Sequence, residues 1–109
     1  MDTATVYHHD GSAWQRRVLQ GVYWVQENIL HADGGMQGMK KAVRMRVPKM
    51  EDGSVPAQPG DILMKGEGPV IGAGYGMAQL RREQDCCVVK AVSDNTGRAH
   101  LAHWRIDGE

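Results

Sequence analysis

A chain of 109 residues is long enough to bury one modest hydrophobic core but not two, which excludes a multidomain protein. Its 13 basic and 13 acidic side chains cancel, so the overall charge favours neither a nucleic-acid partner nor its absence. No apolar run approaches the roughly 18 residues of a membrane span, and the N-terminus shows no charged-then-apolar leader. We therefore expect a protein without a membrane segment that is not exported by a signal peptide.

The N-terminal quarter of the sequence predicts strands. Residues 3–8 form a short β-prone segment that ends in a turn. Residues 13–25 then place their large side chains with a period of two, which is typical of half-buried strands, and Gly21 marks an expected bulge or bend. A helix over residues 14–28 is the alternative, but Gly21 and the β-branched and aromatic content disfavour it.

The clearest strand of the chain is residues 40–47. Val43, Met45 and Val47 alternate with Arg44 and Arg46, so one face is apolar and the other is basic, and a proline ends the run. The preceding segment, residues 26–39, contains an Asp-Gly-Gly sequence and is predicted to be an exposed loop.

Two further loops are expected, over residues 49–60 and over the glycine-rich residues 66–76, on either side of a short strand at 62–65. Residues 77–85 form one short helix or an irregular link. The C-terminal third contains an apolar run at 88–92, a turn cluster at 93–97 and a second apolar run at 101–106, which predicts a hairpin or a wide loop between two strands. We expect the core to include Trp24, Val43, Met45, Trp104 and Ile106.

No residue pattern indicates catalysis, a cofactor or a metal. The glycines of residues 72–76 are spaced G-x-G-x-G, which lacks the spacing of the phosphate-binding loops. Cys86 and Cys87 are adjacent, so they point to opposite faces of a strand and are expected to stay reduced, one of them buried. In a strand, His100 and His103 also face apart. A small enzyme with a Cys/His site is the remaining alternative of this class.

One local charge asymmetry stands out. Between residues 34 and 50 there are five basic residues and no acidic one: Lys40, Lys41, Arg44, Arg46 and Lys49. Lys40, Lys41, Arg44 and Arg46 are candidates to face DNA or an acidic partner. The alternative is a solvated outer strand face. A nucleic-acid-binding β-barrel module is one function that this asymmetry predicts.

Four segments, in this order along the chain, resemble the small neck proteins of tailed bacteriophages and prophages, the head-closure (stopper, head–tail connector) group. They are Thr5-Val6-Tyr7, the run WQRRVLQGVYW at 14–24, the strand 43–48 followed by PGDILMKG at 59–66, and the ending with Asp94-Asn95, Gly97 and LAHWRIDG at 101–108. Together they span nearly the whole chain.

That resemblance implies a mainly β fold, a small β-barrel with long loops and at most one short helix, in a single domain over residues 1–109. It also implies a virion protein, assembled in the bacterial host cytoplasm and located in the neck of the particle. There it is expected to form a ring with copies of itself, six in number, between the portal or adaptor ring and the tail terminator or tail tube proteins, with packaged DNA as a further contact. A tail terminator or tail completion ring is the alternative within the same particle.

The same resemblance brings no catalytic residue with it, and we expect no enzyme activity, no cofactor and no membrane partner. The loop that follows the clearest strand is the candidate to reach the central channel, through Lys49, Met50, Glu51, Asp52, Gly53 and Ser54. Residues 46–60 form a shorter linker than such proteins often have.

Overall fold

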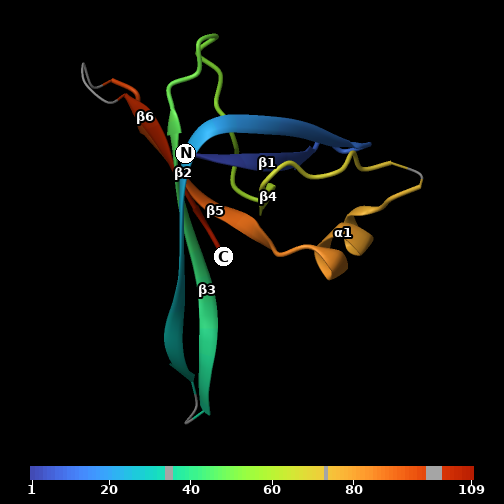
Figure 1. The fold of residues 1–109 in the computed structure, drawn as a ribbon, viewed down its shortest axis with the longest axis vertical. Helices are drawn as coiled ribbons and strands as arrows, with labels where there is room; N and C mark the ends of the chain where they lie inside the picture. Colours follow the sequence, from blue (N-terminus) through green and yellow to red (C-terminus); the bar gives the residue numbers. More distant parts are fainter. Residues whose placement is uncertain (34–35, 73, 98–101) are drawn as a thin grey trace.

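The structure is a computed structural model that describes residues 1–33, 36–72, 74–97 and 102–109, with the backbone alone at 28–33 and 36–40. Six antiparallel strands form a closed barrel in the order β1-β2-β3-β6-β5-β4 (Figure 1). The elements are β1 (Asp2–His9), β2 (Trp14–Asp33), β3 (Met36–Pro48), β4 (Ile62–Lys65), α1 (Met77–Glu83), β5 (Cys86–Asn95) and β6 (His103–Gly108). The prediction of a small, mainly β barrel with one short helix is confirmed.

Side chains from all six strands fill the barrel interior. Val43, Met45 and Ile106 are buried there, as predicted, beside residues such as Val6 and Leu63. Because these side chains occupy the centre, the barrel is a packed core and not a binding cavity. Trp24 and Trp104 were expected in this core, but they lie half-buried against its edge.

Gly21 is the bulged residue that the sequence predicted. The register between β1 and β2 pairs Asp2 with Val22 and Thr3 with Gln20, which leaves Gly21 unpaired, and its φ is +71°. Glycine adopts that left-handed conformation without the Cβ penalty of other residues. At this bulge β2 leaves β1 and begins to pair with β3, so Gly21 directs the strand from one side of the barrel to the other.

Residues 26–39 are not the exposed loop that was predicted. Strand β2 continues to Asp33 and β3 begins at Met36, and the pair Asp33↔Met36 completes the ladder. The two strands therefore form an antiparallel hairpin, and Gly34 and Gly35, which the prediction assigned to the loop, lie outside the described residues. Seven register pairs, from Glu27↔Ala42 to Asp33↔Met36, form beyond the barrel and pair only with each other. In Figure 1 this arm projects along the longest axis of the molecule.

A second apolar cluster lies outside the barrel. Helix α1, Ile71 and Tyr75 pack there on the outer faces of β1, β4 and β5, and Leu80 is completely buried among Tyr7, Ile62 and Met64. Consequently these strands are buried on both faces, as the pattern of four consecutive buried residues in β1 shows. The predicted short helix is confirmed, and its role is to cover this side of the barrel.

The glycine-rich loop over residues 66–76 is anchored at its start. The Thr5 hydroxyl donates to the Gly66 carbonyl (2.7 Å) and accepts from the Gly68 N–H (2.8 Å), while the Tyr7 hydroxyl donates to the Pro69 carbonyl (2.7 Å). Gly68 has no room for a side chain, because an added Cβ would lie 2.2 Å from the Tyr7 hydroxyl. The loop prediction is confirmed in position, but its first residues are part of the packed structure.

Candidate interaction surfaces

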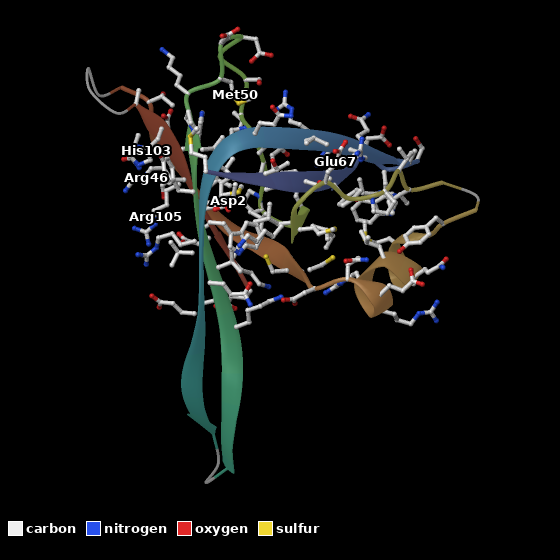
Figure 2. The ribbon with its side chains drawn as sticks, in the orientation of Figure 1. Asp2, Arg46, Met50, Glu67, His103 and Arg105 are labelled. Atoms are coloured by element: carbon white, nitrogen blue, oxygen red, sulfur yellow. The ribbon has the colours of Figure 1, made fainter. Side chains whose placement is uncertain are left out.

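The outer face of β2, β3 and β6 is uncovered within the part of the chain that the structure describes, and it carries the arginines. Antiparallel register aligns Tyr23 on β2, Arg46 on β3 and Arg105 on β6 in one row across the sheet. The next row aligns Val25, Arg44 and Asp107. We call this surface the arginine face. Its strand residues alternate inward and outward, so all three guanidinium groups lie on the same outer surface. Figure 2 shows Arg46 and Arg105 on this side.

Charge on the arginine face is unevenly compensated. Asp107 contacts both Arg44, at 3.6 Å, and Arg105, at 3.3 Å. Arg46 has no carboxylate partner among the described residues, yet it lies directly opposite Arg105 in the β3–β6 pair. Like charges directly opposite each other destabilise a sheet. The isolated chain therefore retains a repulsion that a bound carboxylate or phosphate would relieve.

Two shallow hollows meet on this face. One, of about 320 Å³, is lined by Arg46, Asn95, His103 and Arg105 among others. The other, of about 280 Å³, includes Tyr23 and shares His103 and Arg46 with the first. Tyr23 and Val25 are exposed by 54% and 51%, which is high for large apolar side chains. Aromatic and arginine residues together are typical of protein interfaces.

The four predicted basic residues fall into two groups. Arg44 and Arg46 lie on the arginine face as the alternation indicated. Lys41 does not: its ammonium group is ion-paired with Asp85 and donates to the Cys86 carbonyl at 2.9 Å, so it fastens the base of the projecting arm to β5. The Lys40 side chain lies outside the described residues.

Sequence analysis missed Arg105. In β6, His103 and Arg105 face away from the barrel interior, and His103 is buried while Arg105 is half-buried. Trp104 packs against the interior, because adjacent strand residues face opposite ways. The sequence pointed to Arg105 only through its position two residues after His103, which places both side chains on the same face of a strand. Its partnership with Arg46 depends on a strand register that the sequence does not specify.

The loop over residues 49–60 divides into an exposed tip and a fixed base. The tip is a turn from Met50 to Gly53, closed by the Gly53 N–H donating to the Met50 carbonyl at 3.0 Å. Glu51 and Asp52 are exposed in this turn. Hydrogen bonds from Ser54 hold the pKa of Asp52 below its ordinary value, so the tip stays anionic at neutral pH.

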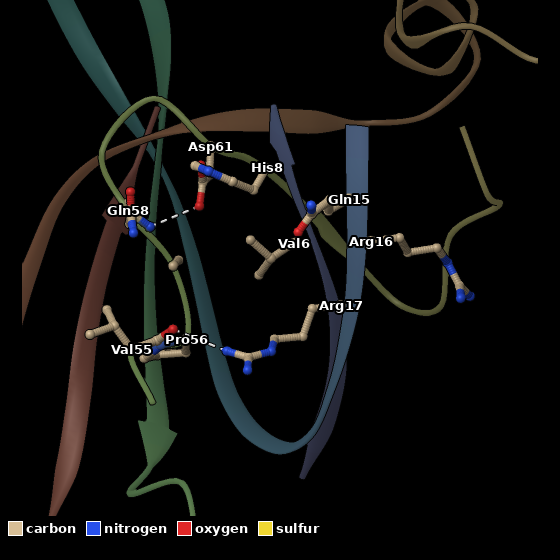
Figure 3. A pocket seen from close by; sticks show the side chains of 10 residues that line it. Val6, His8, Gln15, Arg16, Arg17, Val55, Pro56, Gln58 and Asp61 are labelled. Atoms are coloured by element: carbon tan, nitrogen blue, oxygen red, sulfur yellow. Dashed lines mark hydrogen bonds and ion pairs between the residues drawn. The ribbon is translucent and has the colours of Figure 1, made fainter. Parts of the chain in front are cut away.

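The base of the same loop is held against the barrel. Arg17 donates to the Val55 carbonyl at 3.0 Å (Figure 3) and also to the Ser54 hydroxyl at 3.1 Å. Pro56 and Ala57 are buried beyond that point. Of the predicted channel residues, Lys49, Glu51, Asp52 and Gly53 are exposed, whereas Met50 and Ser54 are half-buried. The prediction of an exposed loop over 49–60 is confirmed for most of its residues, but Pro56 and Ala57 are buried.

Figure 3 shows a pocket of about 290 Å³ beneath this base. His8 and Asp61 are joined by a hydrogen bond of 2.7 Å, and the second carboxylate oxygen of Asp61 accepts from the Gln58 N–H at 2.8 Å. A histidine oriented by a buried carboxylate resembles part of a catalytic site. Here, however, Arg17 and Asp61 already have partners within the chain, so the arrangement fastens the loop to β1 and β2.

The cysteines follow the sequence prediction. Both are free thiols; Cys87 points into the barrel and Cys86 joins the outer apolar cluster. Burial raises the pKa of Cys87 to about 11.

Within the described part of the chain, no three His, Cys, Asp or Glu side chains gather as a metal site would require. His100 lies outside the described residues. In the same part of the chain, no helix has the length and apolar character of a membrane span.

Comparison with known proteins identifies a family but no characterised relative. Residues 1–109 match the family of unknown function DUF6751, and the chain belongs to that family. No curated protein and no solved structure matches the chain.

Proposed function

We propose that this member of the DUF6751 family is a structural subunit of the neck of a tailed phage or prophage particle. In this role it forms a ring of its own copies, six in number, that closes the DNA-filled head and connects the portal or adaptor ring to the tail. It acts in the virion after assembly in the host cytoplasm, without catalysis or a cofactor. The observation that carries the proposal is the β2–β3 arm, which extends seven register pairs beyond a closed barrel.

A ring subunit needs a rigid body and extensions that reach its neighbours. The barrel supplies the body, because its interior is filled and its β1–β4–β5 side is covered by α1. The arm supplies the reach: seven strand residues span about 24 Å at roughly 3.4 Å each. An arm of paired strands with no barrel partner is costly to keep in an isolated monomer, since a lone two-stranded hairpin is only marginally stable in water.

A tail terminator or tail completion ring would use the same parts, and it is the second candidate. The nucleic-acid-binding module is supported less well. Arg44, Arg46 and Arg105 would suit phosphates, but Asp107 lies between two of them and would repel a DNA backbone.

The proposal is tested by removing the gene from the phage or prophage that carries it and examining the particles by electron microscopy. A head-closure protein predicts heads that lose DNA and separate tails of normal length. A tail terminator predicts tails of abnormal length. Normal infectious particles without the protein would contradict both.

A second variant tests the arm itself. Replacing residues 29–40 with an Asn-Gly turn keeps the Asn28↔Lys41 pair and the contact of Lys41 with Asp85. We expect this variant to fold, with an unfolding free energy within about 1 kcal/mol of the parent, because the register pairs it removes from the described backbone are with no other strand. Particles carrying it should lack tails. The control is Gly72→Ala, which meets open space and should leave the particles unchanged.

A further inference from the structure

The arginine face and the tip of the 49–60 loop, the turn from Met50 to Gly53, carry opposite charges. The face carries three guanidinium groups, one of which, Arg46, has no described carboxylate partner. The tip carries two exposed carboxylates, and Glu51 has no cationic partner among the described residues. The whole chain is neutral, so these opposite charges are separated on its surface and not absent from it.

Shape also fits this pairing. The tip is a compact turn that projects from the barrel, held by the hydrogen bond between Gly53 and Met50 and supported at its base by Arg17. The face is hollowed on both sides of His103, next to Arg46. A preordered projection that enters a preformed hollow loses little conformational entropy when it binds.

Figure 2 places Met50 above the barrel and Arg46, Arg105 and His103 on its flank. The tip and the face are therefore different surfaces of one molecule. A contact between the tip of one copy and the face of the next is heterologous, and heterologous contacts produce rings or filaments where isologous ones produce closed dimers.

We propose that the Glu51–Asp52 tip of one copy docks on the arginine face of a second copy, with a carboxylate bound between Arg46 and Arg105. This inference rests on the proposed ring function and specifies the contact that forms the ring. Arginine is suited to the role because its planar guanidinium binds carboxylates in two-point geometry. Tyr23 and Val25, exposed beside the arginines, supply apolar contact area for the same neighbour.

DNA is the competing occupant of the arginine face. Phosphates require a surface that is basic throughout, whereas Asp107 contacts Arg44 and Arg105, and apolar side chains occupy the adjoining β2 positions. A surface that mixes basic, acidic and apolar groups fits a protein partner. The experiment below distinguishes binding of a second copy from binding of DNA.

Charge reversal on the purified full-length chain tests the contact. Sedimentation velocity over a range of concentrations is measured for the wild type, for Glu51→Lys/Asp52→Lys, for Arg46→Glu/Arg105→Glu, and for the chain with all four substitutions. We expect the wild type to self-associate and each reversal to weaken association at least ~10-fold, as for close interfacial charge pairs. The four-substitution chain should associate like the wild type, because its basic tip then meets an acidic face.

Mixing the two reversed proteins gives an independent readout. The basic tip of one fits the acidic face of the other, and the acidic tip fits the basic face, so the mixture should associate where neither protein does alone. Arg46→Glu alone serves as a second face variant, because Arg46 has no described partner whose loss would affect folding. Unchanged circular dichroism confirms that each variant is folded.

Three results would overturn the inference: a wild type that stays monomeric throughout, reversals that leave association unchanged, or a four-substitution chain that fails to recover. Salt-dependent binding of duplex DNA that the face reversal abolishes, while association persists, would assign the face to DNA instead. None of these results alters the particle phenotypes predicted for gene removal, so the ring function and this contact fail separately.

Discussion

The two sides of this barrel differ in what covers them. On the β1–β4–β5 side, α1, Ile71 and Tyr75 pack over the outer surface, and the strands are buried on both faces. On the β2–β3–β6 side the described chain covers nothing, and Arg44, Arg46 and Arg105 extend from the outer face. The chain thus buries one side of the barrel with its own helix and leaves opposed arginines and exposed apolar groups on the other. The covered side stabilises the fold, and the uncovered side is the one that we propose binds a partner.

Leu80→Ala should have the largest effect on the covered side. Leu80 is fully buried between α1 and the barrel, so its truncation removes apolar contacts and leaves a cavity. We expect a loss of about 2–5 kcal/mol in the free energy of unfolding, measured by urea denaturation. The matched control is Tyr23→Ala on the uncovered side, which should change stability by no more than about 0.5 kcal/mol. Equal effects at both positions would remove the distinction between the two sides.

Gly68→Ala should come next. The new Cβ would meet the Tyr7 hydroxyl at 2.2 Å and the Met64 sulfur at 2.9 Å, both within the covered cluster. Overpacking of this kind costs about 1–3 kcal/mol. Gly72→Ala, four residues further along the same loop, meets open space and should be neutral. A lower melting temperature for Gly72→Ala than for Gly68→Ala would show that the loop is not anchored where the hydrogen bonds of Thr5 and Tyr7 indicate.

Arg46→Glu should have the smallest effect and the opposite sign. The substitution replaces two arginines that face each other across β3 and β6 with an oppositely charged pair. We expect the monomer to gain about 0.2–1 kcal/mol, since opposite charges at facing positions stabilise a sheet and like charges destabilise it. The gain should shrink in high salt. Arg44→Glu is the contrasting variant, because it loses the contact with Asp107 and should not stabilise. Destabilisation by Arg46→Glu would show that Arg46 already has a favourable environment in the free chain.

The sequence by itself determined the strands and much of their burial. The alternation around Val43 and Arg44 indicates a strand with one solvent-exposed face, because side chains in a strand point alternately to either surface. The unbroken apolar runs at 62–64 and 86–89 likewise match strands that are covered on both sides. Gly21 was predicted to be a bulge because it is a glycine within a segment whose large side chains follow a period of two.

The tertiary structure alone decided which side chains meet. Strand register places Arg46 opposite Arg105, 59 positions later in the chain, and gives Lys41 to Asp85. The described residues of the segment predicted as a loop belong to β2 and β3, which project as an arm. Such strands are hard to identify from sequence, because each becomes a strand only by pairing with the other. Local propensity acts over a few residues, whereas these pairings depend on closure of the whole barrel, and for that reason the candidate interface appears only in the folded chain.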